Sequence, residues 1–126
     1  MSETKPYYIQ LENRKEYLYV LVGGELLTPK IAQMYWDEIA EKCAELGTTK
    51  ILIEKDFVTT VTPPEILEMG VYLGKILAGK KIAFFDRFQN QDVNQLGKVI
   101  ARNQGVQMRL FENVEEAKRW ICLESV

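Results

Sequence analysis

Residues 50–86 read KILIEKDFVTTVTPPEILEMGVYLGKILAGKKIAFFD, and this stretch decides the fold. It starts with a short apolar strand, 50–54, and ends with a second apolar strand, 81–86. Between them, Thr62-Pro-Pro-Glu65 is a capping box, which predicts a helix over 65–78. A strand, a helix and a second strand in this order predict a parallel pair of strands joined by a right-handed crossover.

The same alternation of strands and helices continues on both sides of this stretch. Two β-branched and aromatic runs near the N-terminus predict a hairpin whose second strand ends in a turn at Gly23-Gly24. Thr28-Pro29 then opens a helix, and two further helices and one strand follow residue 86. We therefore expect a single α/β domain, residues 1–126 with its core over about 7–123. Its mixed, mainly parallel five-stranded sheet carries four helices in the order β-β-α-β-α-β-α-β-α.

Composition and charge exclude several classes of function. The 126 residues carry a formal net charge of −2 with acidic and basic residues interspersed, so we expect no nucleic-acid partner. The N-terminus lacks an apolar signal core, and no apolar run approaches the roughly 20 residues that span a bilayer. We therefore expect a cytoplasmic protein without a membrane span. Histidine is absent, and Cys43 and Cys122 lack Cys-x-x-Cys spacing, so we expect neither a metal nor a cofactor.

The most promising place for a site is the edge of the sheet where the parallel strands end, because ligands usually bind there. The longest loop at this edge is expected at 56–62, and it leads into the amino end of a helix, which favours an anion. The candidate binding residues at this edge and on the neighbouring helix are Asp56, Phe57, Thr59, Thr60, Thr62, Tyr72, Asp86, Arg87 and Phe88.

Two of these candidates, Asp56 and Asp86, follow neighbouring strands of the predicted sheet. Their carboxylates either converge as an acid–base or metal pair, or cap separate turns. An enzyme built on this pair requires the two side chains to lie within roughly 10 Å of each other. Phosphoryl transfer would also need a phosphate-binding lysine at this edge, and no strand-end lysine is expected there.

The helix expected over 65–78 is apolar on more than one face, because only three of its residues are charged. Gly70 and Gly74 also permit another backbone to approach it closely. Two interpretations stay open. Either the helix is wedged between the sheet and its neighbouring helices, or its surplus apolar surface binds a protein partner or a second copy of the chain in a homodimer.

The closing stretch 106–121 reads VQMRLFENVEEAKRWI, which is a strand, a phenylalanine, a polar cap and a Glu-Glu-Ala-x-x-Trp-Ile helix. Together with the order of elements from about Tyr8 to Ile121, it resembles the STAS-like, SpoIIAA-like family. The resemblance implies a non-enzymatic regulatory or binding domain. Such a domain is related in fold to anti-sigma-factor antagonists and, more distantly, to lipid-binding CRAL-TRIO domains.

Antagonists of this kind carry an Asp-Ser-[Ser/Thr]-Gly phosphoacceptor at the start of the second helix. The corresponding residues 60–65 of this chain read TVTPPE, so the serine is missing and prolines stand in its place. Thr59, Thr60 and Thr62 are left as candidate substitutes. An N-cap role, however, explains Thr62 fully.

We therefore expect a non-enzymatic, cytosolic regulatory or protein-interaction module that uses the helix 65–78 and the loop 56–62. The alternative is a module that binds an apolar or anionic small molecule, such as a lipid or a nucleotide. This alternative predicts a pocket larger than roughly 300 Å³ lined by Phe57, Tyr72 and Phe88. An enzyme that uses the two aspartates is the third hypothesis.

Overall fold

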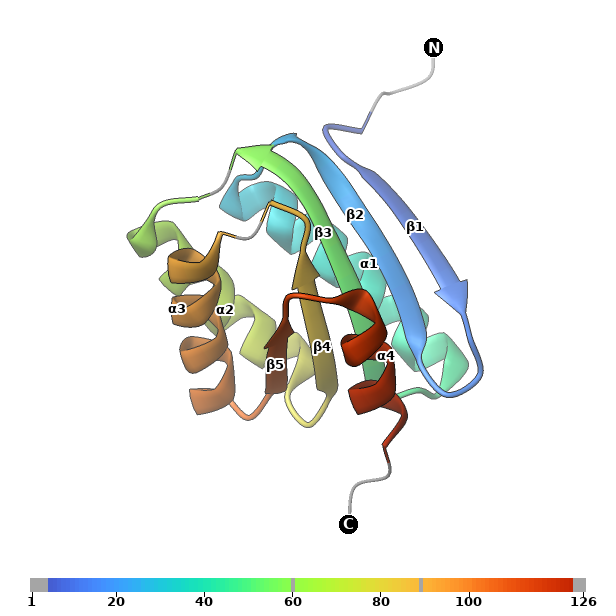
Figure 1. The fold of residues 1–126 in the computed structure, drawn as a ribbon. Coiled ribbons are helices and arrows are strands. Elements are labelled where there is room, and N and C mark those ends of the chain that lie inside the picture. Colours follow the sequence, from blue (N-terminus) through green and yellow to red (C-terminus); the bar gives the residue numbers. More distant parts are fainter. Residues whose placement is uncertain (1–4, 60, 89, 124–126) are drawn as a thin grey trace.

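The computed structural model describes residues 5–59, 61–88 and 90–123, which form a single five-stranded sheet flanked by helices (Figure 1). The elements in chain order are β1 (Tyr8–Asn13), β2 (Leu18–Leu26), α1 (Pro29–Leu46), β3 (Lys50–Thr59), α2 (Pro63–Leu77), β4 (Lys81–Asp86), α3 (Gln91–Asn103), β5 (Gln107–Phe111) and α4 (Val114–Cys122). The strands lie side by side in the order of the sequence. β1 is antiparallel to β2, and all the other pairs are parallel. The predicted fold class and element order are confirmed.

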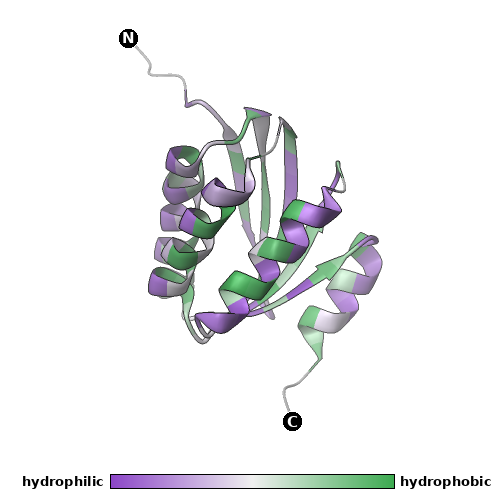
Figure 2. Cartoon of the chain, turned by 90° about the vertical axis from the view of Figure 1, so that its left-hand side faces the viewer, coloured by the Kyte–Doolittle hydropathy of each residue, from purple (hydrophilic) through white to green (hydrophobic). Residues whose placement is uncertain are grey.

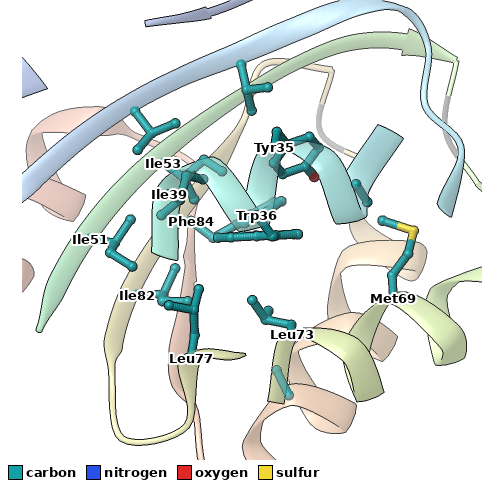
Figure 3. Close-up of a cluster of buried hydrophobic side chains, with 14 of the residues drawn as sticks. Tyr35, Trp36, Ile39, Ile51, Ile53, Met69, Leu73, Leu77, Ile82 and Phe84 are labelled. Atoms are coloured by element: carbon teal, nitrogen blue, oxygen red, sulfur yellow. The ribbon is translucent and has the colours of Figure 1, made fainter. Parts of the chain in front are cut away.

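The helices lie on the two faces of the sheet in unequal numbers. α1, α2 and α3 pack on one face and enclose the main hydrophobic core, whereas α4 packs alone on the other (Figures 1 and 2). Figure 3 shows the main core, where Tyr35 and Trp36 of α1 face Met69 and Leu73 of α2 above the sheet. α4 contacts β3, β4 and β5. On the same face of the sheet, β1 and β2 are not covered by any helix of the described residues.

Local capping signals set the starts of α1, α2 and α4. The Thr28 hydroxyl accepts a hydrogen bond of 3.1 Å from the Ile31 amide at the start of α1. The Thr62 amide donates to Glu65 Oε1 at 2.9 Å, which is one half of the predicted capping box at the start of α2. Asn113 caps α4 by accepting from two backbone amides. These short-range patterns explain why the helix positions follow from the sequence.

The predicted turn at Gly23-Gly24 is wrong, because both glycines lie within β2 and pair with Asp56 and Phe57 of β3. β3 correspondingly continues to Thr59, so residues 56–59 are strand and not loop. A side chain at position 23 has no room, since a Cβ atom there would lie 2.4 Å from the Asp56 carbonyl oxygen. Gly23 therefore allows the backbones of β2 and β3 to approach each other closely, and it does not form a turn.

The close approach predicted at Gly70 and Gly74 is made by α3 of the same chain. A Cβ atom at Gly70 would lie 2.4 Å from Ile100 Cγ2, and one at Gly74 would lie 2.2 Å from Gln104 Cβ. α2 also packs against α1 and the sheet, so it is wedged between its neighbours, and Leu67, which is 54% exposed, is its one exposed large apolar side chain. A partner surface on residues 65–78 stays a prediction. No helix in the described ranges is long and apolar enough to cross a bilayer.

Candidate functional site

The polar residues at the carboxyl ends of the strands divide between the two faces of the sheet. Successive side chains of a strand point to opposite faces, and Lys55 pairs in register with Asp86. Lys55 and Asp86 therefore share the face covered by α1, α2 and α3, whereas Asp56 points to the α4 side. Of the two interpretations left open for Asp56 and Asp86, convergence as an acid–base or metal pair is wrong, because β3 continues as a regular strand past residue 54.

On the α4 side, hydrogen bonds connect the side chains of a cluster that we call the open-face cluster, formed by Tyr8, Tyr19, Glu54, Asp56 and Arg87. Tyr8 reaches across Gly23 and donates its hydroxyl hydrogen to Asp56 Oδ2. Arg87 then donates to Asp56 Oδ2 at 3.3 Å and, through Nη2, to Glu54 Oε2 at 3.1 Å. Tyr19 donates to Glu54 Oε1 at 2.9 Å. The cluster thus links β1, β2, β3 and the end of β4.

The two tyrosines and the arginine of this cluster keep their protons at neutral pH. Burial, and then the hydrogen bond to Glu54, raises the pKa of Tyr19 to about 12. Burial and the hydrogen bond to Asp56 likewise raise the pKa of Tyr8 to about 12. Burial lowers the pKa of Arg87, but its hydrogen bond and charge interaction with Glu54 outweigh this and raise it overall. Two neutral phenols and one guanidinium are therefore presented together.

The open-face cluster is accessible because α4 covers only part of this face (Figure 1). Tyr8 is 43% exposed and Val58, at the end of β3, is 62% exposed. Leu21 and Phe85 are partly exposed beside them. We call the area of Tyr8, Leu21, Val58, Phe85 and Arg87 the open face.

On the other side of the sheet, Lys55, Asp86 and Asn94 form what we call the buried cluster. The Lys55 side chain is 3% exposed, and its Nζ lies 3.6 Å from Asp86 Oδ2 and 3.5 Å from Asn94 Oδ1. Asn94, on α3, donates to Asp86 Oδ2 at 2.8 Å. Asp86 also accepts from the Phe88 amide at 3.0 Å and from the Asn90 side chain at 3.1 Å. The carboxylate thus orders the loop between β4 and α3.

The charges of the buried cluster depend on one another. Burial raises the pKa of Asp86, but the charge of Lys55 and the donors Asn94, Phe88 and Asn90 together hold it below its ordinary value. Burial lowers the pKa of Lys55, and the charge of Asp86 opposes this only in part. The expectation of no lysine at this edge is therefore wrong, because Lys55 lies inside the lengthened β3 and points inward.

Two hollows border the buried cluster. A cavity of about 50 Å³ lies between the sheet and the helices α1, α2 and α3, and Tyr35, Lys55 and Asn94 line it together with apolar side chains. A pocket of about 320 Å³ opens at the carboxyl edge, and Asp86, Asn94 and Arg109 are among its lining residues. Both hollows share the walls formed by Phe84, Asn94 and Leu110.

The larger pocket has the predicted size but not the predicted lining, because Phe57, Tyr72 and Phe88 line neither hollow. Phe57 is fully buried and stacks on Tyr35 at a centroid distance of 6.0 Å. The Tyr72 hydroxyl donates to Asp37 of α1, and Phe88 points to solvent. Of the eight predicted residues that the structure describes, only Asp86 borders either of these hollows, whereas Asp56 and Arg87 meet in the open-face cluster.

The three candidate threonines do not form a common site. Thr59 is exposed at the end of β3, and Thr62 is engaged with Glu65 at the start of α2. Thr60 lies outside the described residues. Among the residues that are described, no group of three or more histidine, cysteine, aspartate or glutamate side chains is placed to hold a metal ion.

Sequence reasoning missed Tyr8, Tyr35, Glu54, Lys55 and Asn94. Strand alternation would have found two of them, since residues 54–56 carry three charged side chains in a row that must divide between the two faces. Tyr35 read only as a core residue of α1. Nothing in the sequence around Tyr8 or Asn94 indicates their partners, because the Tyr8 interaction depends on strand pairing across the sheet and the Asn94 interactions depend on how α3 lies over the sheet.

The comparisons with known proteins concern the fold. No protein-family profile and no curated protein matches the chain. One solved structure that is similar is an uncharacterized protein of the DUF3478 family, with a SpoIIAA-like fold, from Shewanella loihica PV-4. It matches with a TM-score of 0.58 and 18% sequence identity, over 97% of this chain and 99% of the other. The chain therefore has the SpoIIAA-like fold that its closing stretch and element order resemble.

Proposed function

We propose that this chain is a non-enzymatic regulatory module that binds another protein through the open face of its sheet. The observation that carries this proposal is the open-face cluster, in which Arg87 is held by Glu54 and Asp56 while Tyr8 is held by Asp56. These side chains are ordered before a partner arrives, which lowers the entropy lost on binding.

The chemistry of the open face supports the same proposal. Tyrosine and arginine are enriched among the residues that contribute most to protein–protein affinity. Here they stand beside the exposed Val58 and the partly exposed Leu21 and Phe85. Such a mixture of aromatic, aliphatic and guanidinium groups is typical of the central part of an interface.

The two aspartates support a non-enzymatic role. Asp86 accepts hydrogen bonds from three neighbouring residues and faces Lys55 inside the protein. Asp56 lies on the opposite face, where Tyr8 and Arg87 both donate to it. Each carboxylate thus has an architectural task of its own, and the two do not form the paired arrangement that acid–base catalysis needs.

The proposal is tested by the substitution Val58→Lys, which places a positive charge on the open face. This charge is opposite in sign to that of the nearby Asp56 carboxylate, so it does not repel it. The matched control is Val99→Lys, since Val99 is 50% exposed but lies on α3, on the other side of the sheet. Each protein is immobilised in equal amounts, exposed to lysate of the source organism, and the retained proteins are quantified by mass spectrometry. Melting temperatures confirm that both variants are folded.

We expect a retained protein whose amount falls about tenfold or more with Val58→Lys, which corresponds to a loss of about 1.4 kcal/mol in binding. The Val99→Lys variant should retain it as well as the unmodified chain does. The proposal is wrong if both variants retain the same proteins in the same amounts. It is equally wrong if the unmodified chain is strictly monomeric and retains nothing.

A further inference from the structure

The cavity of about 50 Å³ between the sheet and the helices is lined by a buried ammonium group whose hydrogen-bonding capacity is not met. An ammonium group donates three hydrogen bonds. Within the described ranges, Lys55 Nζ donates to Asn94 Oδ1 at 3.5 Å and forms an ion pair with Asp86 Oδ2 at 3.6 Å, so at most two of its three hydrogens have an acceptor. Since Lys55 is 3% exposed, bulk water does not supply the missing acceptors.

A second donor borders the same cavity. Tyr35, on α1, is 1% exposed, and its hydroxyl makes no hydrogen bond to an acceptor in the part of the chain that the structure describes. Burial, and then the charge of Asp86, raises the pKa of Tyr35 well above its usual range, so the hydroxyl keeps its proton. Figure 3 shows the Tyr35 ring next to Trp36, with Met69 and Leu73 of α2 opposite.

Apart from Asn94, the rest of the cavity wall is apolar. Ile66, Met69, Leu73, Met108 and Leu110 contribute side chains, and Gly70 and Gly97 contribute backbone. Two donors in such surroundings favour a ligand atom that accepts two hydrogen bonds and is attached to carbon on its other side. A carbonyl oxygen has this property, because it carries two lone pairs and an apolar substituent.

The charge already present decides between a neutral and an anionic ligand. Lys55 and Asp86 together are neutral, and Asp86 is fully engaged by the amide of Phe88 and by the side chains of Asn90 and Asn94. An anion would leave a second carboxylate-like charge buried beside Asp86, which is strongly unfavourable. A neutral carbonyl adds no charge.

The size of the cavity limits what enters it. Each water-sized group needs about 10–15 Å³, so about 50 Å³ holds three to five of them, which is enough for a carbonyl group and its neighbouring carbons. A ligand of six or seven heavy atoms must also extend past Phe84, Asn94 and Leu110, which form walls of the 320 Å³ pocket at the carboxyl edge as well.

We propose that this chain binds a small, uncharged, apolar molecule that bears a carbonyl group, with the carbonyl oxygen accepting hydrogen bonds from Lys55 Nζ and Tyr35 Oη. The site lies on the covered face of the sheet, opposite the open face. It therefore does not depend on the proposed protein-binding function, and each proposal fails or stands on its own measurement.

The test uses a pair of probes that differ only in the acceptor. Cyclopentanone is titrated into the ¹⁵N-labelled protein, followed by amide chemical shifts, and compared with methylenecyclopentane, in which a CH₂ group replaces the oxygen. Cyclobutanecarboxylate serves as an anion of similar size. We expect saturable shifts at Gly70, Asn94 and Gly97 with the ketone, and binding at least about tenfold weaker with each of the other two probes, because a site built around donors rejects a ligand without an acceptor.

Two variants assign the donors. Tyr35→Phe removes the hydroxyl and keeps the ring, so we expect its Kd for cyclopentanone to rise by about three- to tenfold. Lys55→Met keeps an unbranched side chain, one heavy atom shorter, and removes the charge, and we expect a rise of about tenfold or more. If Lys55→Met does not fold, the change in Kd for cyclopentanone in Tyr35→Phe alone tests the proposal. Its melting temperature should be no lower than that of the unmodified chain, since the lost hydroxyl has no acceptor when the site is empty.

Several results would overturn the proposal. One is equal affinity for the ketone and the methylene compound, and another is tighter binding of the carboxylate. A cavity occupied by water alone would give no saturable shift with cyclopentanone. An unchanged Kd in Tyr35→Phe, or a melting temperature lowered by more than about 4 °C, would show that the hydroxyl serves the fold and not a ligand.

Discussion

The contact between α2 and α3 gives the sharpest test of the packing, through the substitution Gly70→Ala. A Cβ atom at this position would lie 2.4 Å from Ile100 Cγ2 and 3.0 Å from Ile100 Cβ. Carbon atoms in contact prefer a separation of about 3.5–4.0 Å, so α2 and α3 must move apart by roughly 1 Å. Ile100 cannot relieve the clash by rotation alone, because its Cβ position is set by the α3 backbone.

The expected change in the free energy of unfolding combines two opposing effects. Overpacking of this kind costs about 2–3 kcal/mol, whereas replacing a helical glycine by alanine contributes about 1 kcal/mol of stability. The net loss for Gly70→Ala is therefore about 1–2 kcal/mol. The control Gly97→Ala lies on the facing helix, where the new Cβ atom would lie 3.3 Å from Ile66 Cγ1, an atom that a change of side-chain rotamer displaces. This variant should be more stable than the unmodified chain by up to about 1 kcal/mol.

Urea denaturation followed by circular dichroism separates the two variants. With a slope of about 1–3 kcal/mol per molar urea, a difference of about 1–3 kcal/mol shifts their midpoints apart by about 0.3–3 M. If the two variants change stability by the same amount within about 0.5 kcal/mol, α2 and α3 are not in the close contact described, and the interpretation of Gly70 as a packing residue is refuted.

Two further predictions follow from the sheet. Gly23→Ala places a Cβ atom 2.4 Å from the Asp56 carbonyl oxygen and against the Tyr8 side chain, so we expect the free energy of unfolding measured by urea denaturation to fall by about 2 kcal/mol. Unchanged stability would contradict the register of β2 and β3. The pKa of Asp86 is lower in the folded chain than its ordinary value of 3.8, so the ionised carboxylate stabilises the folded state. This stabilisation is fully present above about pH 4, and it is lost as the pH falls through the pKa of the folded chain. The difference in stability between the unmodified chain and Asp86→Asn should therefore narrow as urea midpoints are measured from pH 5 down to pH 2, and a constant difference would show that the carboxylate titrates normally.

The fold was predictable because its signals are local. Thr28 and Asn113 cap helices by accepting from backbone amides two or three residues away, and the Thr62 amide donates to the Glu65 side chain three residues away. Each strand is an apolar run bounded by polar residues or glycine. Parallel topology follows from the alternation of strands and helices. None of these inferences requires knowledge of which residues meet across the sheet.

The candidate site was predicted only in part, because its geometry depends on the length and register of the strands. Asp56 and Arg87 were found as neighbours of strand ends, and they do meet. Asp86 was found, but its partner Lys55 was missed. The expected strand ended at residue 54, so the alternation of side chains along it did not predict which face of the sheet Lys55 points to. Phe57 was predicted to line a pocket because it was also placed beyond the end of the strand, whereas its side chain points into the main core and is buried.

The length of β3 therefore determines both proposed sites, and Gly23 and Gly24 help to set that length. Because β2 continues through the two glycines, β3 has a hydrogen-bonding partner as far as Thr59. Once β3 is extended, strict alternation sends Glu54 and Asp56 to the open face and Lys55 to the cavity. A shift of one residue in this register would exchange the two sets, placing a lysine on the open face and two carboxylates in the apolar interior. The buried Lys55–Asp86 pair opposes such a shift, since it would leave Asp86 without its counter-charge.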